Sequence, residues 1–191
     1  MKLVFATHNL GKLQEVRELL SPDYEVIGLN DLGDHEEIEE TALTLEGNAW
    51  IKARTVWENY GLSCFSDDTG LEIEALNNAP GVFSARYAGQ AKSPDANMDK
   101  VLTELNGVKN RKARFRTAVA LVLQGEEYLF EGTVQGEITS VRSGVKGFGY
   151  DPIFSPDGFS GTFAEMDAAT KNEISHRGLA MKKLVAFLSA H

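Results

Sequence analysis

The sequence predicts an α/β fold, a long and curved mixed β-sheet flanked by helices. The chain opens with a buried strand over residues 3–6, a helix, and a second strand over residues 24–29, which is the order of a βαβ unit. Two longer strands follow over residues 113–123 and 127–140, and residues 124–126 suit a hairpin turn between them. This mixture of strands and helices along the whole chain favours an α/β class.

The helices are predicted from apolar residues at helical spacing and from the residues that bound them. Residues 44–60 and 177–189 have this spacing, and Ser93-Pro94 opens a third helix that runs to Leu105. The first helix ends at residues 21–23, where serine, proline and aspartate interrupt the pattern. Its apolar positions are Leu13, Val16, Leu19 and Leu20.

A short strand over residues 62–66 runs straight into the Asp-Asp-Thr-Gly sequence of residues 67–70, which places the paired acids at a strand end, before a turn. Beyond it, apolar residues at positions 71, 73 and 75 alternate with Glu72 and Glu74. This alternation predicts a second, half-exposed strand with both glutamates on its outer face.

The composition fits one compact domain, residues 1–191, with at most two lobes. With 42% apolar residues, a chain of 191 residues can bury one sizeable core. The formal charge of −9 repels polyanions at long range, so we do not expect a dedicated nucleic-acid binder. The basic residues between positions 109 and 116 are interpreted as a solvated loop and the outward face of a strand.

The chain is expected to be cytoplasmic, with no membrane partner. The apolar run at residues 3–6 is far too short for a signal peptide or a membrane span. Cys64 is the only cysteine, which excludes an intrachain disulfide and fits a reducing compartment. We interpret Cys64 as a small core residue.

Small and polar residues between the first strand and the first helix form a candidate phosphate site. A helix N-terminus offers free N–H groups and the positive end of the helix dipole. Thr7 and Asn9 can donate hydrogen bonds, Gly11 permits a close approach, and Lys12 adds a full charge. The segment lacks the longer glycine-rich loop of a P-loop. The alternative is a capped helix with a surface lysine.

Asp67 and Asp68 form a candidate metal site. Adjacent carboxylates repel each other unless a cation lies near them, and Mg²⁺ prefers such oxygen ligands. One carboxylate can also activate a water molecule. The alternative is an Asp-rich turn. Residues 34–40 hold five more carboxylates, which we interpret as a solvated loop.

Aromatic residues in a glycine-rich loop are candidates for binding a flat ring. Phe148 and Tyr150 flank Gly149 and precede Asp151, so their rings are suited to stacking. The alternative is a hydrophobic turn that fills the core.

Basic residues gather before the last helix, for which Ser175 suits an N-cap. Lys171, His176 and Arg177 place hydrogen-bond donors at the positive end of the helix dipole, which disfavours cations. A ligand that accepts hydrogen bonds would explain them. The alternative is a capped helix start with solvated charges.

Taken together and in order, these segments resemble the inosine triphosphate pyrophosphatase (ITPase) family, nucleoside-triphosphate diphosphatases that clear non-standard purines. Each match alone is weak, but the ordered set spans nearly the whole chain and is specific. The matching stretches are residues 7–12, Glu40-Thr41, residues 66–71, residues 80–87, residues 148–154, and Ser175-His176-Arg177.

The resemblance implies a role for each matching position. The triphosphate would be held by Thr7, His8, Asn9, Leu10, Gly11 and Lys12. Glu40 and Asp68 would bind Mg²⁺, Asp68 would also accept a proton, and Thr69 would touch the substrate. The nucleoside and base would be surrounded by Phe148, Gly149, Tyr150, Asp151, Lys171, His176 and Arg177. The family also implies a homodimer and an elongated fold with two lobes around a central substrate cleft.

The chain departs from the family pattern at a few positions. His8 stands where many relatives have glycine, which matters if that position needs a positive backbone angle. Thr69 replaces serine and keeps the hydroxyl. The usual Glu-Asn-Ala run reads Glu46-Gly47-Asn48-Ala49, so no role is assigned to Glu46.

The implied reaction converts ITP, dITP or XTP and water to the monophosphate and pyrophosphate. Hypoxanthine and xanthine carry a 6-keto acceptor, which donors such as Arg177 would bind, whereas the 6-amino group of adenine would leave them unpaired. Two alternatives stay open: another metal-dependent phosphohydrolase, such as a pyrimidine-directed pyrophosphatase, and a non-catalytic nucleotide-binding module. Glu40, Asp67 and Asp68 argue against the second, because a site that only binds a polyanion would not favour carboxylates without a metal.

Overall fold

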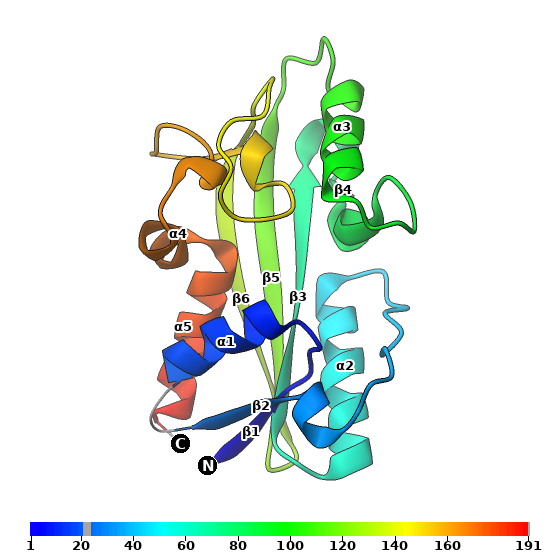
Figure 1. Ribbon diagram of the computed structural model, residues 1–191, viewed down its shortest axis with the longest axis vertical. Helices are drawn as coiled ribbons and strands as arrows, with labels where there is room; N and C mark the ends of the chain where they lie inside the picture. Colours follow the sequence, from blue (N-terminus) through cyan, green and yellow to red (C-terminus); the bar gives the residue numbers. More distant parts are fainter. Residues whose placement is uncertain (21–23, 191) are drawn as a thin grey trace. The chain divides into compact units, whose positions relative to one another are not determined.

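The computed structural model describes residues 1–20 and 24–190 of the chain (Figure 1). Within these residues, seven strands form one sheet in the order β2-β1-β3-β5-β6-β7, with β4 paired to β3. β1 pairs with β2 and β3 in parallel, whereas the pairs β3–β4 and β6–β7 are antiparallel. The predicted mixed sheet with flanking helices is confirmed. No helix in the described part of the chain is long and apolar enough to cross a membrane.

The chain divides into two compact units, described separately below. Unit 1 comprises Met1–Asp68, Ala118–Glu131 and Ala180–His191, and unit 2 comprises Thr69–Thr117 and Gly132–Leu179. The divisions fall inside β3, β5, β6 and the last helix, α5, so these four elements contribute residues to both units.

Unit 1 begins with the predicted βαβ arrangement. β1 (Lys2–Phe5) and β2 (Glu25–Gly28) are parallel and in register along their whole length, and α1 (Leu10–Leu20) connects them. The inward face of α1 is apolar, as its spacing predicts. The expected end of this helix, at residues 21–23, lies outside the described residues. Among the side chains of α1 that the structure describes, Leu13, Val16 and Leu20 are buried, whereas that of Leu19 lies outside the described ones.

The helix α2 (Leu45–Tyr60) begins and ends where its local sequence predicts. The Thr44 side chain accepts a hydrogen bond from the Gly47 N–H at 3.0 Å, and Gly61 ends the helix in the left-handed conformation, with φ 62°. Two side chains of β3 reach its backbone: the Cys64 thiol and the Ser66 hydroxyl donate to carbonyls of α2 at 3.1 and 2.5 Å. Cys64 is therefore a core residue, as expected.

The largest hydrophobic cluster described in unit 1 lies on the other face of β3, because successive side chains of a strand alternate. The Phe65 ring stacks on the Phe5 ring with a centroid distance of 4.6 Å. Helices α1 and α5 (His176–Leu188) pack against these rings. The buried apolar residues from the last part of the chain are Ala180, Met181, Leu184 and Leu188.

The acidic segment lies inside a strand, so the expected strand end at the paired acids is wrong, and so is the alternative of an Asp-rich turn. β3 is one continuous strand, Cys64–Ile73, and the Asp-Asp-Thr-Gly sequence occupies its middle. Turn-forming residues are tolerated there because cations from elsewhere in the chain compensate the carboxylates: Lys12 binds Asp67 within unit 1. The strand then ends in a 3₁₀ turn, η2 (Glu74–Leu76), before β4 (Ala79–Pro80).

Unit 2 contains most of the remaining elements. Among them is α3 (Pro94–Glu104), which Ser93 caps. β5 (Lys112–Leu123) and β6 (Glu126–Ile138) contribute to both units, and the two residues that join them belong to unit 1 and have φ of 52° and 91°, as a type I′ hairpin turn requires. The short helix α4 (Ala168–Ile174) was not predicted. The other elements are η1 (Leu29–Leu32) in unit 1, and η3 (Gly81–Arg86), η4 (Asp151–Ile153), β7 (Phe154–Pro156) and η5 (Phe163–Glu165) in unit 2.

An aromatic cluster forms the core of unit 2. Phe115 of β5 contacts the Phe154 ring edge-on at 4.7 Å and stacks on the His176 ring, also at 4.7 Å. Aliphatic residues of β3 and α3, among them Leu71 and Val101, complete this core.

Glu72 is buried, contrary to the prediction that it faces water. Its two carboxylate oxygens bind Arg114 at 2.6 Å and Arg116 at 3.1 Å on β5, and only 10% of its side chain is exposed. Arg111 similarly donates to three backbone carbonyls. The basic segment is therefore bonded to the protein itself and is not simply solvated.

Replacing Glu72 by glutamine is expected to lower the free energy of unfolding by about 1–3 kcal/mol, because it leaves two arginines without their shared counter-charge. Urea denaturation measures this loss. The matched control is Glu127→Gln, which breaks the pair between Glu127 and Arg54, whose side chains are 42% and 51% exposed. An exposed pair contributes under about 1 kcal/mol. Equal losses in both variants would contradict a structural role for the Glu72 pair.

Candidate functional site

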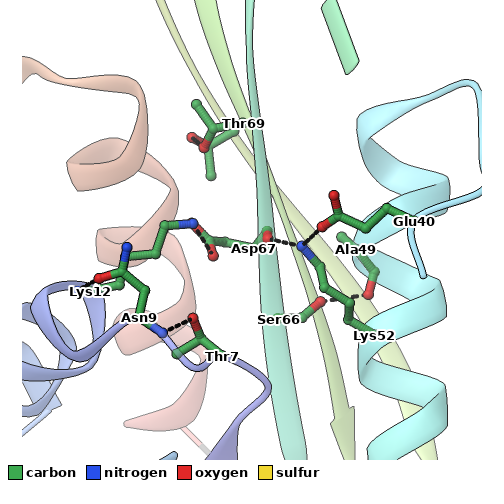
Figure 2. Close-up of polar contacts among 10 residues, drawn as sticks. Thr7, Asn9, Lys12, Glu40, Ala49, Lys52, Ser66, Asp67 and Thr69 are labelled. Carbon is green, nitrogen blue, oxygen red and sulfur yellow. Dashed lines mark hydrogen bonds and ion pairs between the residues drawn. The ribbon is translucent and has the colours of Figure 1, made fainter. Parts of the chain in front are cut away.

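The phosphate-site candidate in unit 1 lies at the carboxyl ends of two parallel strands. The register Val4↔Cys64 and Phe5↔Phe65 pairs β1 with β3, so the chain leaves β1 beside the Asp67 end of that pairing. Lys12, in the first turn of α1, reaches across to Asp67. Its ammonium group lies 2.9 and 3.0 Å from the two carboxylate oxygens (Figure 2). The strand pairing thus explains why these two charges meet.

The segment before α1 is a capped helix start. The Asn9 side-chain oxygen accepts from the Lys12 N–H at 3.0 Å, and the Thr7 hydroxyl oxygen accepts from the Asn9 N–H at 3.1 Å. In these bonds the two side chains act as acceptors, where the sequence had suggested donors. The cap occupies the Lys12 N–H, so the other first-turn N–H groups of α1 are the natural anion donors.

The His8 ring points to other protein groups. Its Nδ1 lies 3.1 Å from the Asn30 side-chain oxygen, and its Nε2 lies 3.0 Å from the Glu36 carbonyl oxygen. His8 does not have a positive φ, so the absence of glycine causes no strain. Any contact of His8 with a phosphate therefore has to come from its backbone. The neighbouring Leu10 side chain is 68% exposed.

Glu40 is held by a lysine that sequence reasoning missed. The Lys52 ammonium group lies 2.5 Å from a Glu40 carboxylate oxygen and 2.8 Å from the Asp67 backbone carbonyl oxygen (Figure 2). Burial lowers the pKa of Lys52, but the carboxylates of Asp68, Glu40 and Asp67 together raise it above its usual value. Lys52 is therefore a firmly protonated cation among acids.

A pattern in the sequence of α2 indicates Lys52. Its buried stripe runs through positions 45, 49, 53 and 56, and position 52 belongs to the same helical face. A lysine on such a face needs a partner. Asn48, also on α2 and fully buried, accepts from the Ala42 N–H at 2.9 Å and fastens the segment that carries Glu40 to the helix.

The acidic residues of unit 1 fit Mg²⁺ by their chemistry. Glu40, Asp67 and Asp68 supply hard carboxylate oxygens. Across residues 1–20 and 24–190, however, no three His, Cys, Asp or Glu side chains are gathered closely enough to hold a metal ion. Mg²⁺ commonly binds through one or two carboxylates, with phosphate and water oxygens completing its coordination. The residues present suit that mode.

Unit 2 contains a second candidate group, built around Asp151. This carboxylate is 3% exposed, and its Oδ2 accepts from the Phe148 N–H at 2.8 Å and from the Lys171 ammonium group at 2.5 Å. A side chain at Gly147, which has φ 75°, would place its Cβ 2.0 Å from the same oxygen. Only glycine therefore permits this turn, which fixes the Phe148 backbone on Asp151.

Phe148 is the exposed aromatic residue of this group. Its ring is 61% exposed, and the Lys171 ammonium and Arg177 guanidinium groups lie 4.8 and 5.4 Å from the ring centre. A flat, exposed ring beside two cations suits stacking with a base and hydrogen bonding to its acceptors.

The Tyr150 ring is in the core of unit 2, so the prediction that it stacks on a ligand is wrong. The side chain is 5% exposed, its hydroxyl donates to the Ser84 carbonyl at 2.7 Å, and burial raises the pKa of the phenol. Tyr150 instead anchors the loop that carries Phe148. Gly149, between them, has φ 61°.

The predicted Ser175 cap is confirmed, because its hydroxyl accepts from the Gly178 N–H at 3.1 Å. His176 and Arg177 are each 6% exposed, so they are not the solvated charges of the alternative interpretation. Lys171 belongs to α4 and not to the start of α5. Thr69, the remaining candidate, shares a hydrogen bond of 2.7 Å with the Thr117 hydroxyl. The substrate contacts of all these residues stay predictions.

The chain is similar to characterised proteins along its full length. It is 50% identical to the dITP/XTP pyrophosphatase of Flavobacterium johnsoniae, covering 100% of this chain and 99% of that protein. It is 47% identical to the dITP/XTP pyrophosphatase of Bacillus subtilis, covering 98% and 96%. These names agree with the resemblance found in the sequence.

Solved structures agree as well. The Ham1 protein of Staphylococcus aureus matches with a TM-score of 0.94 at 39% identity, covering 100% of this chain and 99% of that one. The HAM1 protein of Coxiella burnetii also has a TM-score of 0.94 at 39% identity, covering 100% of both chains. The model of the Ham1 family matches residues 3–187. With sequence, fold and family model in agreement over nearly its whole length, the chain belongs to the Ham1 family.

Proposed function

We propose that this chain hydrolyses non-standard purine nucleoside triphosphates, ITP, dITP and XTP, to the monophosphate and pyrophosphate, with Mg²⁺ as its cofactor. The observation that carries the proposal is the charged network of unit 1, in which Lys12 and Lys52 both bind Asp67 and Lys52 also binds Glu40. Such a network offers cations for phosphates and carboxylates for a metal. The names of the full-length relatives support the substrate class.

In the proposed reaction, water attacks the α-phosphorus, the bond from that phosphorus to the bridging oxygen breaks, and pyrophosphate leaves. Mg²⁺, when bound, neutralises phosphate charge and polarises the reacting phosphate. Asp68 accepts the proton of the attacking water. Lys12 and the first-turn N–H groups of α1 stabilise the charge on the leaving group. Lys52 keeps Glu40 and the Asp67 backbone in place.

The group in unit 2 is proposed to recognise the base. Phe148 offers its exposed face for stacking, and Arg177 offers donors to the 6-keto oxygen that hypoxanthine and xanthine carry and adenine lacks. Asp151 and Lys171 keep Phe148 in position through the contacts described above.

Incubation with ITP and Mg²⁺ is expected to yield IMP and pyrophosphate in equal amounts, since attack at the α-phosphorus leaves the β–γ bond intact. EDTA should abolish the reaction and added Mg²⁺ should restore it. Chromatography of the products from ITP, XTP, dITP, GTP and ATP measures both effects. IDP and orthophosphate as first products would place the cleavage elsewhere, and full activity in chelator would remove the metal from the proposal.

The same assay, extended to pyrimidine triphosphates, tests the two alternative functions, a pyrimidine-directed pyrophosphatase and a non-catalytic nucleotide-binding module. Preferred turnover of a pyrimidine triphosphate such as dUTP would support a pyrimidine-directed enzyme. Tight binding of ITP with no turnover in Mg²⁺ would support a binding module.

The proposal also includes a single domain, a homodimer, a cytoplasmic location, and no nucleic-acid or membrane partner. The family resemblance implies the homodimer, and the acidic composition, with a formal charge of −9, disfavours a nucleic-acid partner. Light scattering on the purified chain gives its mass in solution, and a monomeric mass would contradict the dimer.

A further inference from the structure

Lys12, the proposed phosphate ligand, is bound to an anion of the protein itself. Its ammonium group lies 2.9 and 3.0 Å from the two carboxylate oxygens of Asp67, so it is within hydrogen-bonding distance of both. The Asp67 side chain is 3% exposed and the Lys12 side chain 23% exposed. A phosphate that binds Lys12 has to compete with a carboxylate already placed there.

The second lysine of the site is bound in a similar way. Lys52 lies 2.5 Å from Glu40 and 2.8 Å from the backbone carbonyl of Asp67, and only 14% of its side chain is exposed. Asp67 therefore links the two lysines, one through its side chain and the other through its backbone (Figure 2).

The charges of this network oppose a triphosphate that arrives alone. Three carboxylates, Glu40, Asp67 and Asp68, accompany two lysines, so the site carries one excess negative charge. Displacing Asp67 from Lys12 also separates a buried carboxylate from an ammonium group 2.9 Å away, which is unfavourable. A divalent cation reverses the excess charge and gives the displaced carboxylate a new partner.

The network also disfavours a divalent cation that arrives alone. The described residues offer no ready set of three ligating side chains, and Asp67 and Glu40 are each engaged by a lysine. Phosphate oxygens have to complete the coordination, and phosphates also take over the lysines that the carboxylates release.

We propose that Asp67 is an internal competitor for Lys12, so that the site binds a triphosphate and a divalent cation together and disfavours either one alone. This inference rests on the proposed function. It assigns a role to Asp67, for which the family resemblance implies none. Such coupling is reciprocal: each ligand raises the affinity for the other by the same factor.

Calorimetric titration with the non-hydrolysable α,β-methylene analogue of ITP tests the inference. In EDTA, Asp67→Asn is expected to bind the analogue about tenfold more tightly than the wild type, because asparagine keeps the shape but releases Lys12. The ratio of the affinities in Mg²⁺ and in EDTA should fall by a similar factor. The complex that Mg²⁺ forms with the analogue in solution is common to both proteins and cancels from this comparison.

The matched control is Glu127→Gln, which also removes one negative charge from unit 1 and breaks an ion pair, with Arg54. It should leave both affinities unchanged. Thermal melting checks that the variants are folded. Lys12→Met provides an independent measurement: it releases Asp67, so binding of Mn²⁺ alone, followed by electron paramagnetic resonance, should tighten at least about fivefold.

The outcomes separate this inference from the proposed function. If the wild type binds the analogue in Mg²⁺ but Asp67→Asn binds it no more tightly in EDTA, the competitor role is overturned and the proposed function stands. If Asp67→Asn does not fold, the Lys12→Met variant decides the question. Binding of Mn²⁺ to Lys12→Met with the same affinity as to the wild type would overturn the competitor role. If the wild type fails to bind the analogue even in Mg²⁺, the proposed function fails, and the inference fails with it.

Discussion

Replacing Asp68 by asparagine is expected to reduce kcat for ITP by at least ~10²-fold, the low end of what a general base contributes. Asparagine keeps the size and shape of the side chain but can neither accept the proton of the attacking water nor offer its charge to Mg²⁺. Binding of the nucleotide should change much less, because Lys12 and the first-turn N–H groups of α1 remain. Steady-state kinetics with ITP, together with titration of the non-hydrolysable analogue, separates the two effects.

Glu127→Gln is the control for this variant as well, because it makes the same chemical change in an exposed pair of unit 1. It should keep normal turnover. If Asp68→Asn retains turnover close to that of the wild type, the assignment of Asp68 as base is wrong, and Asp67 becomes the next candidate.

The parts of the fold that depend on neighbouring residues were predictable. Helices α2 and α3 begin directly after Thr44 and Ser93. The side chain of each of these residues accepts a hydrogen bond from the backbone N–H three residues later in the sequence. The βαβ opening follows from short apolar runs with a polar break between them. Helix α4 also has an N-cap residue, because the Asp167 carboxylate accepts a hydrogen bond from the Thr170 N–H at 2.8 Å. Its seven residues, however, contain too little apolar pattern to indicate a helix.

The errors arose where a remote partner decides the local structure. Asp67 and Asp68 favour a turn by composition, yet they lie in β3, where Lys12, 55 positions earlier, binds Asp67. Glu72 looks solvent-facing until Arg114, 42 positions away, pairs with it. Tyr150 is buried because its hydroxyl finds the Ser84 carbonyl, 66 positions away. No window of local sequence contains these partners.

The candidate site was predictable as a set of residues but not as a network. Sequence patterns and the family resemblance pointed to Lys12, Glu40 and Asp68. Lys52 was missed, because the lysine looked like an ordinary residue of a surface helix. Its role depends on Glu40 and the Asp67 backbone, which lie 12 and 15 positions away. The ion pair between Lys12 and Asp67 likewise depends on the pairing of β1 with β3.

Replacing Arg177 by alanine is expected to lower kcat/KM for ITP about 10- to 150-fold, the equivalent of the 1.5–3 kcal/mol that a hydrogen bond to a charged group contributes. The value for ATP should change much less, because the 6-amino group of adenine never accepts that bond. The substitution should not affect the metal or the attacking water, because the proposed role of Arg177 is to bind the base. The measurement is the ratio of kcat/KM for ITP to kcat/KM for ATP, which does not depend on the fraction of folded enzyme.

This ratio separates a recognition role for Arg177 from a structural one. Arg177 is 6% exposed and its guanidinium lies 5.4 Å from the Phe148 ring centre, so its loss also removes packing. If Arg177 had a purely structural or phosphate-binding role, its replacement would lower kcat/KM for ITP and for ATP by the same factor. That result would contradict base recognition. Arg177→Lys keeps the charge but loses the planar fork of donors, so its ratio should fall as well. Arg142→Ala, which removes an arginine of unit 2 bound to Asp95 and Asp99, should leave the ratio unchanged because its contacts lie outside the Phe148 group.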